Sequence, residues 1–126
     1  MASILRVNTL TDASSNNSTA TSTIFNGTGK SYAATNSDFS ALVGSFNVSS
    51  LTDIESGKST ITFSSNMNNT QYTVTHGNGT GGNNGNKYWL LNNTIASNSY
   101  QTWARNNGDS AWADTPIASV THGDLA

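Results

Sequence analysis

The stretch TITFSSNMNNTQYTVTH, residues 60–76, decides the fold class of this chain. Apolar side chains alternate with Thr at Ile61 and Phe63 and again at Tyr72 and Val74, and Ser and Asn separate the two runs. Period-two alternation bounded by turn-forming residues is typical of β-strands that bury one face. Thr, Val, Ile and aromatic residues also suit the pleated surface of a sheet. The stretch therefore predicts two strands.

Similar runs recur along the chain, often at a spacing of roughly 8–12 residues, which is typical of a sandwich or barrel. They are Phe46–Val48, Tyr88–Leu91, Tyr100–Ala104 and Ile117–Val120. The single proline, Pro116, is expected to open the last strand or to lie at a sheet edge. Helical spacing is found over residues 37–44, where Ser37 is a candidate cap for one or two turns. We predict an all-β fold, a small antiparallel β-sandwich or barrel with an N-terminal arm and at most one short helix.

The chain divides into two segments. Residues 1–23 are predicted to form the N-terminal arm, in which a short apolar segment precedes a low-complexity stretch. Residues 24–126 carry the regular strand pattern and are predicted to form the β domain. Leu5, Val7 and Leu10 of the arm are candidate docking residues, and the arm is interpreted either as a strand added to a neighbouring subunit or as an ordinary first strand.

Composition limits the classes of function. Ser, Thr, Asn and Gly make up 66 of 126 residues and only 10% are charged, a balance that by itself suggests disorder. However, 34% of the residues are hydrophobic and many lie in the strand-like runs, so we interpret the small polar residues as exposed faces and loops of a folded domain. Five scattered Lys and Arg residues form no basic patch, which argues against nucleic acid as a partner. Without Cys, a disulfide framework or thiol nucleophile is excluded.

The sequence also bears on location. No run approaches the roughly 18 apolar residues of a transmembrane helix, so no membrane partner is expected. Residues 1–8 lack the continuous apolar region of a secretory signal. Charge-poor chains rich in Ser, Thr, Asn and Gly are nevertheless common on extracellular surfaces and fibres. A virion protein that is assembled in the host cytoplasm and released by lysis would reconcile these two observations.

Three motifs are weighed as sites of chemistry and set aside. Residues 77–82 match G-x-G-x-x-G, but no helix is expected after them, so a long hairpin loop is favoured over a dinucleotide site. His76 and His122, the only two histidines, lack the further ligands of a metal site. Asp109 and Asp114 are better interpreted as part of a solvated turn than as a glycosidase pair. We predict no catalytic residue, no cofactor and no metal, and therefore no enzyme activity.

Aromatic residues are the best candidates for contact with a partner, because they bind sugar rings and anchor protein interfaces. Trp89 and Trp103 lie in strand-like runs and are expected to belong mostly to the core. Trp112 lies between two Ala residues near a turn and is expected to be exposed. We predict Trp112 and Tyr100 as candidate exposed contact residues.

A block in the middle of the chain combines Ser45–Asp53, Ser56-Gly57-Lys58, Thr60–Phe63, Met67 and Gln71–Val74. This block resembles a module of the virion structural proteins of marine tailed bacteriophages, the cyanophages and pelagiphages, where it occurs in fibre-like and head-decorating proteins. Phe25–Gly29, Met1–Asn17 and Ala118–Asp124 are similar to further segments of the same family. The chain departs from the family pattern over residues 30–44, which are longer, and at Asn68 and Asn69, which replace Pro and Asp.

The resemblance implies an oligomeric virion protein with a compact β fold and no catalytic residues. We therefore expect a non-enzymatic structural protein of a tailed-phage virion, preferably a capsid decoration or knob protein of the cement type that is docked on the head by interface burial. The alternative is a short tail-fibre or fibre-tip subunit that binds host surface glycan. The expected partners are the major capsid protein or other virion proteins, and further copies of this chain. A length of 126 residues favours the outer surface of the head over the tail.

Overall fold

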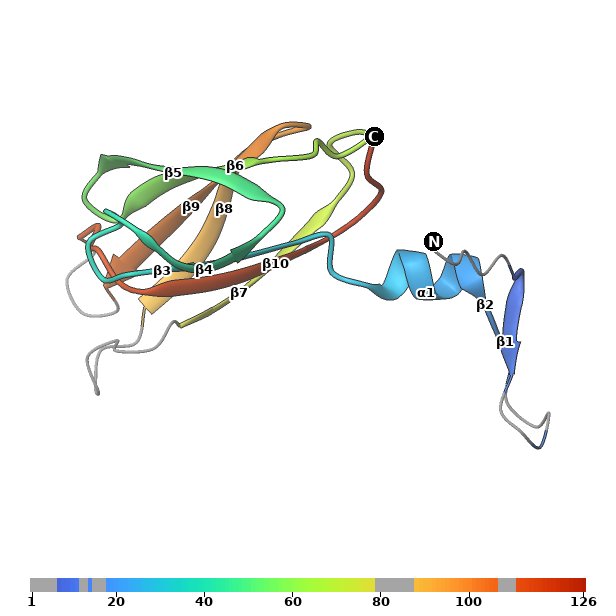
Figure 1. Ribbon diagram of the computed structural model, residues 1–126. Helices are drawn as coiled ribbons and strands as arrows, with labels where there is room; N and C mark the ends of the chain where they lie inside the picture. Colours follow the sequence, from blue (N-terminus) through green and yellow to red (C-terminus); the bar gives the residue numbers. More distant parts are fainter. Residues whose placement is uncertain (1–6, 12–13, 15–17, 79–87, 107–110) are drawn as a thin grey trace.

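The computed structural model describes residues 7–11, 14, 18–78, 88–106 and 111–126, and eight of its strands form two four-stranded antiparallel sheets (Figure 1). Sheet I contains β3 (Ser31–Thr35), β4 (Leu42–Phe46), β7 (Thr73–Asn78) and β10 (Ile117–His122) in the order β4-β3-β10-β7. Sheet II contains β5 (Val48–Glu55), β6 (Lys58–Phe63), β8 (Tyr88–Ala96) and β9 (Ser99–Asn106) in the order β5-β6-β9-β8. This arrangement confirms the predicted all-β fold, and Pro116 lies immediately before β10 as expected.

The core lies between the two sheets. Its main cluster consists of Ala33, Ile61, Phe63, Met67, Tyr72, Val74 and Tyr100. Ile61 on β6 pairs with Tyr100 on β9, and the ring of Phe63 lies 5.7 Å from that of Tyr72 and 5.6 Å from that of Tyr100. The two alternating runs of residues 60–76 thus belong to different sheets, because β6 is in sheet II and β7 in sheet I. The apolar side chains of both runs are buried in the same core.

Buried hydroxyl groups complete this core and form hydrogen bonds with one another. Ser31 bonds Thr121 within sheet I at 2.7 Å, and Ser59 bonds Thr102 within sheet II at 3.0 Å. All four residues are at most 1% exposed. A buried hydroxyl costs free energy unless it has a partner, and each of these pairs satisfies both members. The interpretation of the small polar residues as exposed faces and loops is therefore wrong for these four.

Asn47 is the corner at which the chain leaves sheet I and enters sheet II, between β4 and β5. Its φ of 54° lies in the left-handed region, which Asn tolerates better than most residues. Its side-chain amide donates to the carbonyls of Lys30 at 3.0 Å and Ser65 at 3.1 Å, and its carbonyl oxygen accepts from the Ser65 backbone N–H at 2.7 Å. One side chain therefore ties the corner to the residue before β3 and to the residues after β6.

The expected helix over residues 37–44 is wrong. Residues 37–40 form turns between β3 and β4, and residues 42–46 are strand β4. The turns are closed by Asn36, whose backbone N–H donates to the Ala41 carbonyl and whose side chain accepts from the Ala41 N–H, each at 3.0 Å. Phe39 reaches the core, 1% exposed, by adopting a φ of 55°. The helical spacing of the apolar residues thus reflects a turn that buries Phe39 beside a strand, and the short helix forms elsewhere.

The N-terminal arm extends away from one end of the sandwich (Figure 1). It consists of an antiparallel hairpin of β1 (Thr9–Thr11) and β2 (Ser18–Ala20), followed by α1 (Thr21–Gly27), in which no residue is buried. The predicted boundary between residues 23 and 24 falls inside α1, and the first strand of the sandwich begins at Ser31. No helix among the described residues is long and apolar enough to cross a membrane.

Candidate functional site

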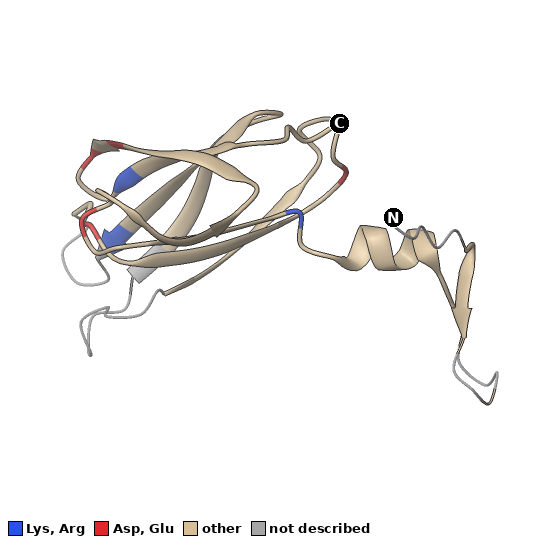
Figure 2. Ribbon diagram, in the orientation of Figure 1, with Lys and Arg blue, Asp and Glu red and all other residues tan. Residues whose placement is uncertain are grey.

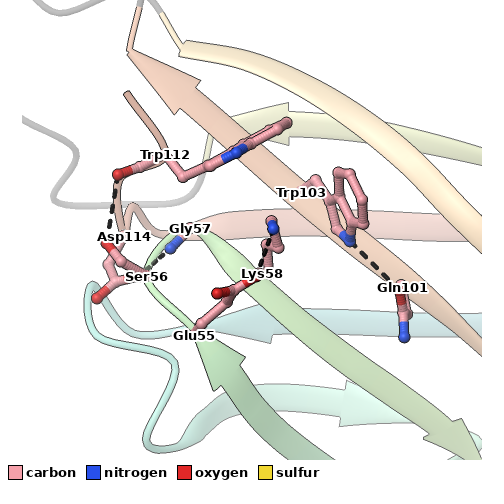
Figure 3. Close-up of polar contacts among 8 residues, drawn as sticks. All are labelled: Glu55, Ser56, Gly57, Lys58, Gln101, Trp103, Trp112 and Asp114. Atoms are coloured by element: carbon pink, nitrogen blue, oxygen red, sulfur yellow. Dashed lines mark hydrogen bonds and ion pairs between the residues drawn. The ribbon is translucent and has the colours of Figure 1, made fainter. Parts of the chain in front are cut away.

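Most of the described Lys, Arg, Asp and Glu residues gather at the end of the sandwich opposite the arm (Figure 2). We call this end, formed by the β5–β6 turn, the last residues of β9 and residues 111–115, the distal end. It also carries two of the three Trp residues (Figure 3). The distal end therefore carries Trp and Arg side chains, which are residue types enriched at protein interfaces.

Trp103 and Trp112 form an edge-to-face pair at the distal end. Their ring centroids lie 5.1 Å apart and their planes meet at 80°. The Lys58 ammonium lies 4.6 Å from the centroid of Trp103 and 5.1 Å from that of Trp112, and the Arg105 guanidinium lies 5.6 Å from that of Trp112. Both cations are within the range of a cation–π interaction. The result is a compact cluster of alternating cationic and aromatic groups.

Strand pairing places these side chains together. Lys58 on β6 pairs in register with Trp103 on β9, and Arg105 forms an isolated bridge with Trp112. The side chains of β9 alternate, so Tyr100, Thr102 and Ala104 face the core while Gln101, Trp103 and Arg105 are only partly buried on the outer face of sheet II. The Trp103 indole N–H donates to the Gln101 side-chain oxygen at 3.3 Å along this outer face.

Gly57 braces the segment that carries Trp112. Its N–H donates to the Asp114 carboxylate, and its carbonyl accepts from the Ala104 N–H at 2.7 Å (Figure 3). Its φ is +73°, and an added Cβ would lie 2.5 Å from the Ala104 carbonyl oxygen and 2.6 Å from the Ala113 nitrogen. Only glycine fits this position, where the β5–β6 turn, β9 and residues 112–114 meet.

A charged pair flanks the aromatic cluster. Glu55 and Lys58, at the two ends of the β5–β6 turn, form an ion pair in which the Lys58 side chain is 15% exposed and the Glu55 side chain 61%. Because Glu55 is largely in solvent, the pair contributes little to stability by itself. The ion pair instead helps to position Lys58, because the Glu55 carboxylate and the two indole rings together restrict where the Lys58 ammonium can lie.

The candidate contact residues behave differently from one another. Trp112 is partly buried against Trp103 and is not freely exposed. The prediction that Tyr100 is exposed is wrong, because it is 0% exposed and its hydroxyl lies 2.6 Å from that of Ser119. Burial raises the pKa of Tyr100 to about 12, and the hydrogen bond to Ser119 opposes that shift. Tyr100 alternates into the core, a position that no surface ligand reaches.

The expectation for Trp103 was also wrong, because it lies on the outer face of sheet II and not in the core. The sequence held a signal for this position: Trp103 shares its alternation phase with the long polar residues Gln101 and Arg105. The side chain of Trp89 lies outside the described residues. Lys58 and Gly57 had no role in the sequence-based prediction of the site, because their function depends on strand pairing.

The predicted docking residues lie in the arm. Leu5 falls outside the described residues, whereas Val7 is 38% exposed and Leu10, on β1, is 46% exposed. On α1, Phe25 is 68% exposed. The arm therefore presents apolar side chains that the sandwich of the same chain does not cover.

The two histidines are not register partners in the fold. His76 on β7 pairs with Ser119 on β10, whereas His122 on β10 pairs with Thr73 on β7, so the two histidines lie at different register positions of this strand pair. The His76 side chain contacts the Asn92 amide, and burial lowers its pKa. In the part of the chain that the structure describes, no group of three or more His, Asp or Glu residues is placed to hold a metal ion.

Two further expectations concern loops. Residues 79–87 and Asp109 lie outside the described residues, so the structure does not describe the Gly-rich stretch beyond Asn78. A hairpin loop between β7 and β8 is nevertheless wrong, because these strands belong to different sheets. Asp114, the other carboxylate considered for sugar chemistry, accepts the Gly57 N–H and so has a structural contact.

Comparison of the chain with protein-family models, with curated proteins and with solved structures found no match.

Proposed function

We propose that this chain is a non-enzymatic structural protein of a tailed-phage virion, a capsid decoration or knob protein that docks on the head through its N-terminal arm. The observation that carries this proposal is the separation of the two ends of the molecule. Val7, Leu10 and Phe25 are exposed on the arm, and most of the described charged residues lie at the distal end (Figure 2). A protein with one end attached to a particle and the other presented to the medium needs this polarity.

The arm suits docking by interface burial. A two-stranded hairpin and a seven-residue helix are each marginal in water without packing against another surface. Burying one Leu or Phe side chain against a partner contributes about 1.5–3 kcal/mol. Val7 and Leu10 are exposed on the arm and can supply this free energy to a neighbouring virion protein. The partners that follow are the major capsid protein or another virion protein.

The sequence supports the virion part of the proposal. Residues 45–78 resemble the module of marine phage structural proteins, and these residues run from the end of β4 through the corner at Asn47, β5 and β6 to the end of β7. A surface with only 10% charged residues also depends little on electrostatics, which salt of marine strength screens heavily. The proposed location is the outer surface of the head, with assembly in the host cytoplasm.

The test measures incorporation into virions. Tagged full-length chains are expressed in infected host cells, and the amount in purified virions is compared for wild type, the double variant Val7→Ser/Leu10→Ser and the control Leu91→Ser. Leu91 is 45% exposed on sheet II, which matches the 46% of Leu10. We expect the double variant to fall by roughly tenfold or more and the control to incorporate normally. Equal incorporation of all three would refute arm docking, and immunogold label on the tail would refute the head location.

A second candidate function is that of a tail-fibre or fibre-tip subunit that binds host surface glycan. The Trp103–Trp112 pair at the distal end favours it, because indole rings stack on sugars and Gln101 lies beside them as a hydrogen-bonding group. A glycan array tests this candidate. Selective binding that Trp103→Ala or Trp112→Ala abolishes and that Val43→Ala, at an exposed residue of β4 in sheet I, retains would support it, and absence of binding by the wild type would reject it.

A further inference from the structure

The outer face of sheet I is apolar and uncovered. Phe46, Tyr32 and Val120 pair in register across β4, β3 and β10, and Phe46 is 62% and Tyr32 40% exposed. Small residues form the adjacent row, in which Gly44, Ala34, Ala118 and Gly77 pair across the four strands. None of the strands of sheet I contains Lys, Arg, Asp or Glu. Large exposed aromatic side chains beside a row of small uncharged residues are typical of a protein interface.

A second apolar surface of the same chain has the same character. Ile24 is 39% and Phe25 68% exposed on α1, and no residue from Ser18 to Gly29 is charged. The strands of sheet I contain no Lys, Arg, Asp or Glu, and the charge beside Phe25 is the Lys30 ammonium, which already bonds the Phe25 carbonyl and the Thr28 hydroxyl. The two surfaces therefore match each other in polarity, whereas the charged distal end matches neither.

Lys30 links α1 to the end of the sandwich, and in this structure the arm extends outward from that end (Figure 1). Its ammonium donates to the Phe25 carbonyl in the last turn of α1 and to the Thr28 hydroxyl, and it lies 5.7 Å from the Phe25 ring centroid. Its backbone N–H donates to the Thr121 carbonyl of β10 at 2.7 Å. A cation at a helix C-terminus is stabilising, and here it fixes α1 at the end of the sandwich and directs it outward (Figure 1).

We propose that α1 of a second copy of this chain packs on the outer face of sheet I, with Ile24 and Phe25 of one copy against Tyr32 and Phe46 of the other. Both surfaces occur once in every chain, so reciprocal exchange of the two arms covers all four surfaces of a dimer. A stable interface uses roughly 20–30 residues a side, which an arm segment of Ser18–Gly29 and the sheet face together approach. The proposal assigns the α1 part of the arm to self-association and leaves Val7 and Leu10 for the virion.

The absence of native Cys makes a direct test possible. Two differently tagged chains, one with Phe25→Cys and one with Phe46→Cys, are mixed and oxidised mildly, and the disulfide-linked products are identified by mass spectrometry. We expect a mixed disulfide that joins one chain of each kind, because the reciprocal contact in the same pair keeps both native residues, Phe25 of one chain and Phe46 of the other. The matched control replaces Phe46→Cys by Ser50→Cys, at an exposed residue of β5 in sheet II, and should give little mixed product.

Light scattering after size-exclusion chromatography gives the second readout. We expect wild-type protein to be an oligomer, and Phe25→Ser and Phe46→Ser each to be a monomer with an unchanged unfolding transition by circular dichroism. A monomeric wild type at tens of micromolar, or cross-links confined to pairs of Phe46→Cys chains, would overturn the proposal. This inference does not depend on the proposed function. A chain that enters virions but is monomeric in solution would refute self-association through α1 and leave the proposed virion function standing.

Discussion

The hydroxyl groups of Tyr100 and Ser119 lie 2.6 Å apart in the core and join sheet II to sheet I by a hydrogen bond. Tyr100 is 0% and Ser119 1% exposed, so water cannot replace either partner. The Ser119 hydroxyl has only a longer contact, 3.4 Å to the Ala33 carbonyl, as an alternative. This bond is one of the polar contacts that link the two sheets directly, and the contacts of Asn92 on β8 with His76 and the Val74 carbonyl on β7 are others.

Tyr100→Phe is expected to lower the free energy of unfolding by about 1–3 kcal/mol, because it leaves a buried hydroxyl unsatisfied. Ser119→Ala should have a similar cost. The double variant should lose less than the sum, since neither partner is then left alone, and urea unfolding of all four proteins measures this coupling. Strict additivity would show that the hydrogen bond contributes nothing.

Stability should fall in alkaline solution because of two buried phenols. Burial raises the pKa of both Tyr72 and Tyr100 to about 12 from an ordinary value of 10.0. Between these values the unfolded chain loses phenolic protons that the folded chain retains, so the free energy of unfolding decreases as pH rises from 10.0 towards about 12. Tyr100→Phe should flatten this dependence, and the double variant Tyr72→Phe/Tyr100→Phe should flatten it further. Identical slopes for all three proteins would contradict the assignment.

Gly57→Ala is expected to destabilise the distal end. The new Cβ meets the Ala104 carbonyl oxygen and the Ala113 nitrogen, and the backbone at φ +73° disfavours any side chain. The segment that carries Trp112 must then move, which should change the tryptophan fluorescence as well as lower the melting temperature. Gly77→Ala is the control, because a Cβ there meets no atom within 4 Å. Unchanged fluorescence in Gly57→Ala would show that Gly57 does not position Trp112.

Asn47→Ala should cost about 2–4 kcal/mol in the free energy of unfolding, through lost hydrogen bonds and a left-handed φ that alanine tolerates poorly. Asn47→Gly keeps the left-handed conformation but removes the side chain that bonds Lys30 and Ser65. We expect its cost to be intermediate. If Asn47→Gly is as stable as wild type, only the backbone conformation at this corner matters and the side-chain contacts do not.

Local alternation predicted most strands because the pattern is itself the cause of burial. Every second side chain of a strand lies on the same face of the sheet. The alternation of Ile61 and Phe63 with Thr therefore both indicated the strand and places these two side chains in the core. Phe39 shows where the pattern fails, since a turn with a left-handed residue buried an apolar group that helical spacing also matched. A strand was predicted in the arm, where β1 lies, but its partner β2 was not predicted, because its three residues are small and exposed and carry no apolar alternation.

The candidate site was predicted less well than the fold. Trp112 was identified, but its partners Lys58, Trp103 and Arg105 come from strands whose register no local pattern specifies. Tyr100 was assigned to the surface because an aromatic residue suits either face of a sheet. In the structure, the side chains of Gln101 and Trp103 lie on the outer face of sheet II, and Tyr100, which alternates with them along β9, faces the core.

The sequence by itself determined that this chain forms β-strands, that it is nearly uncharged and that an apolar segment precedes the β domain, because these properties follow from residue type and local spacing. Only the tertiary structure decided which hydroxyl groups are buried in pairs, which face of sheet II carries the tryptophans and which way Lys30 directs the arm. These depend on contacts such as Ser31 with Thr121, separated by 90 positions, and such contacts exist only once the sheets have formed.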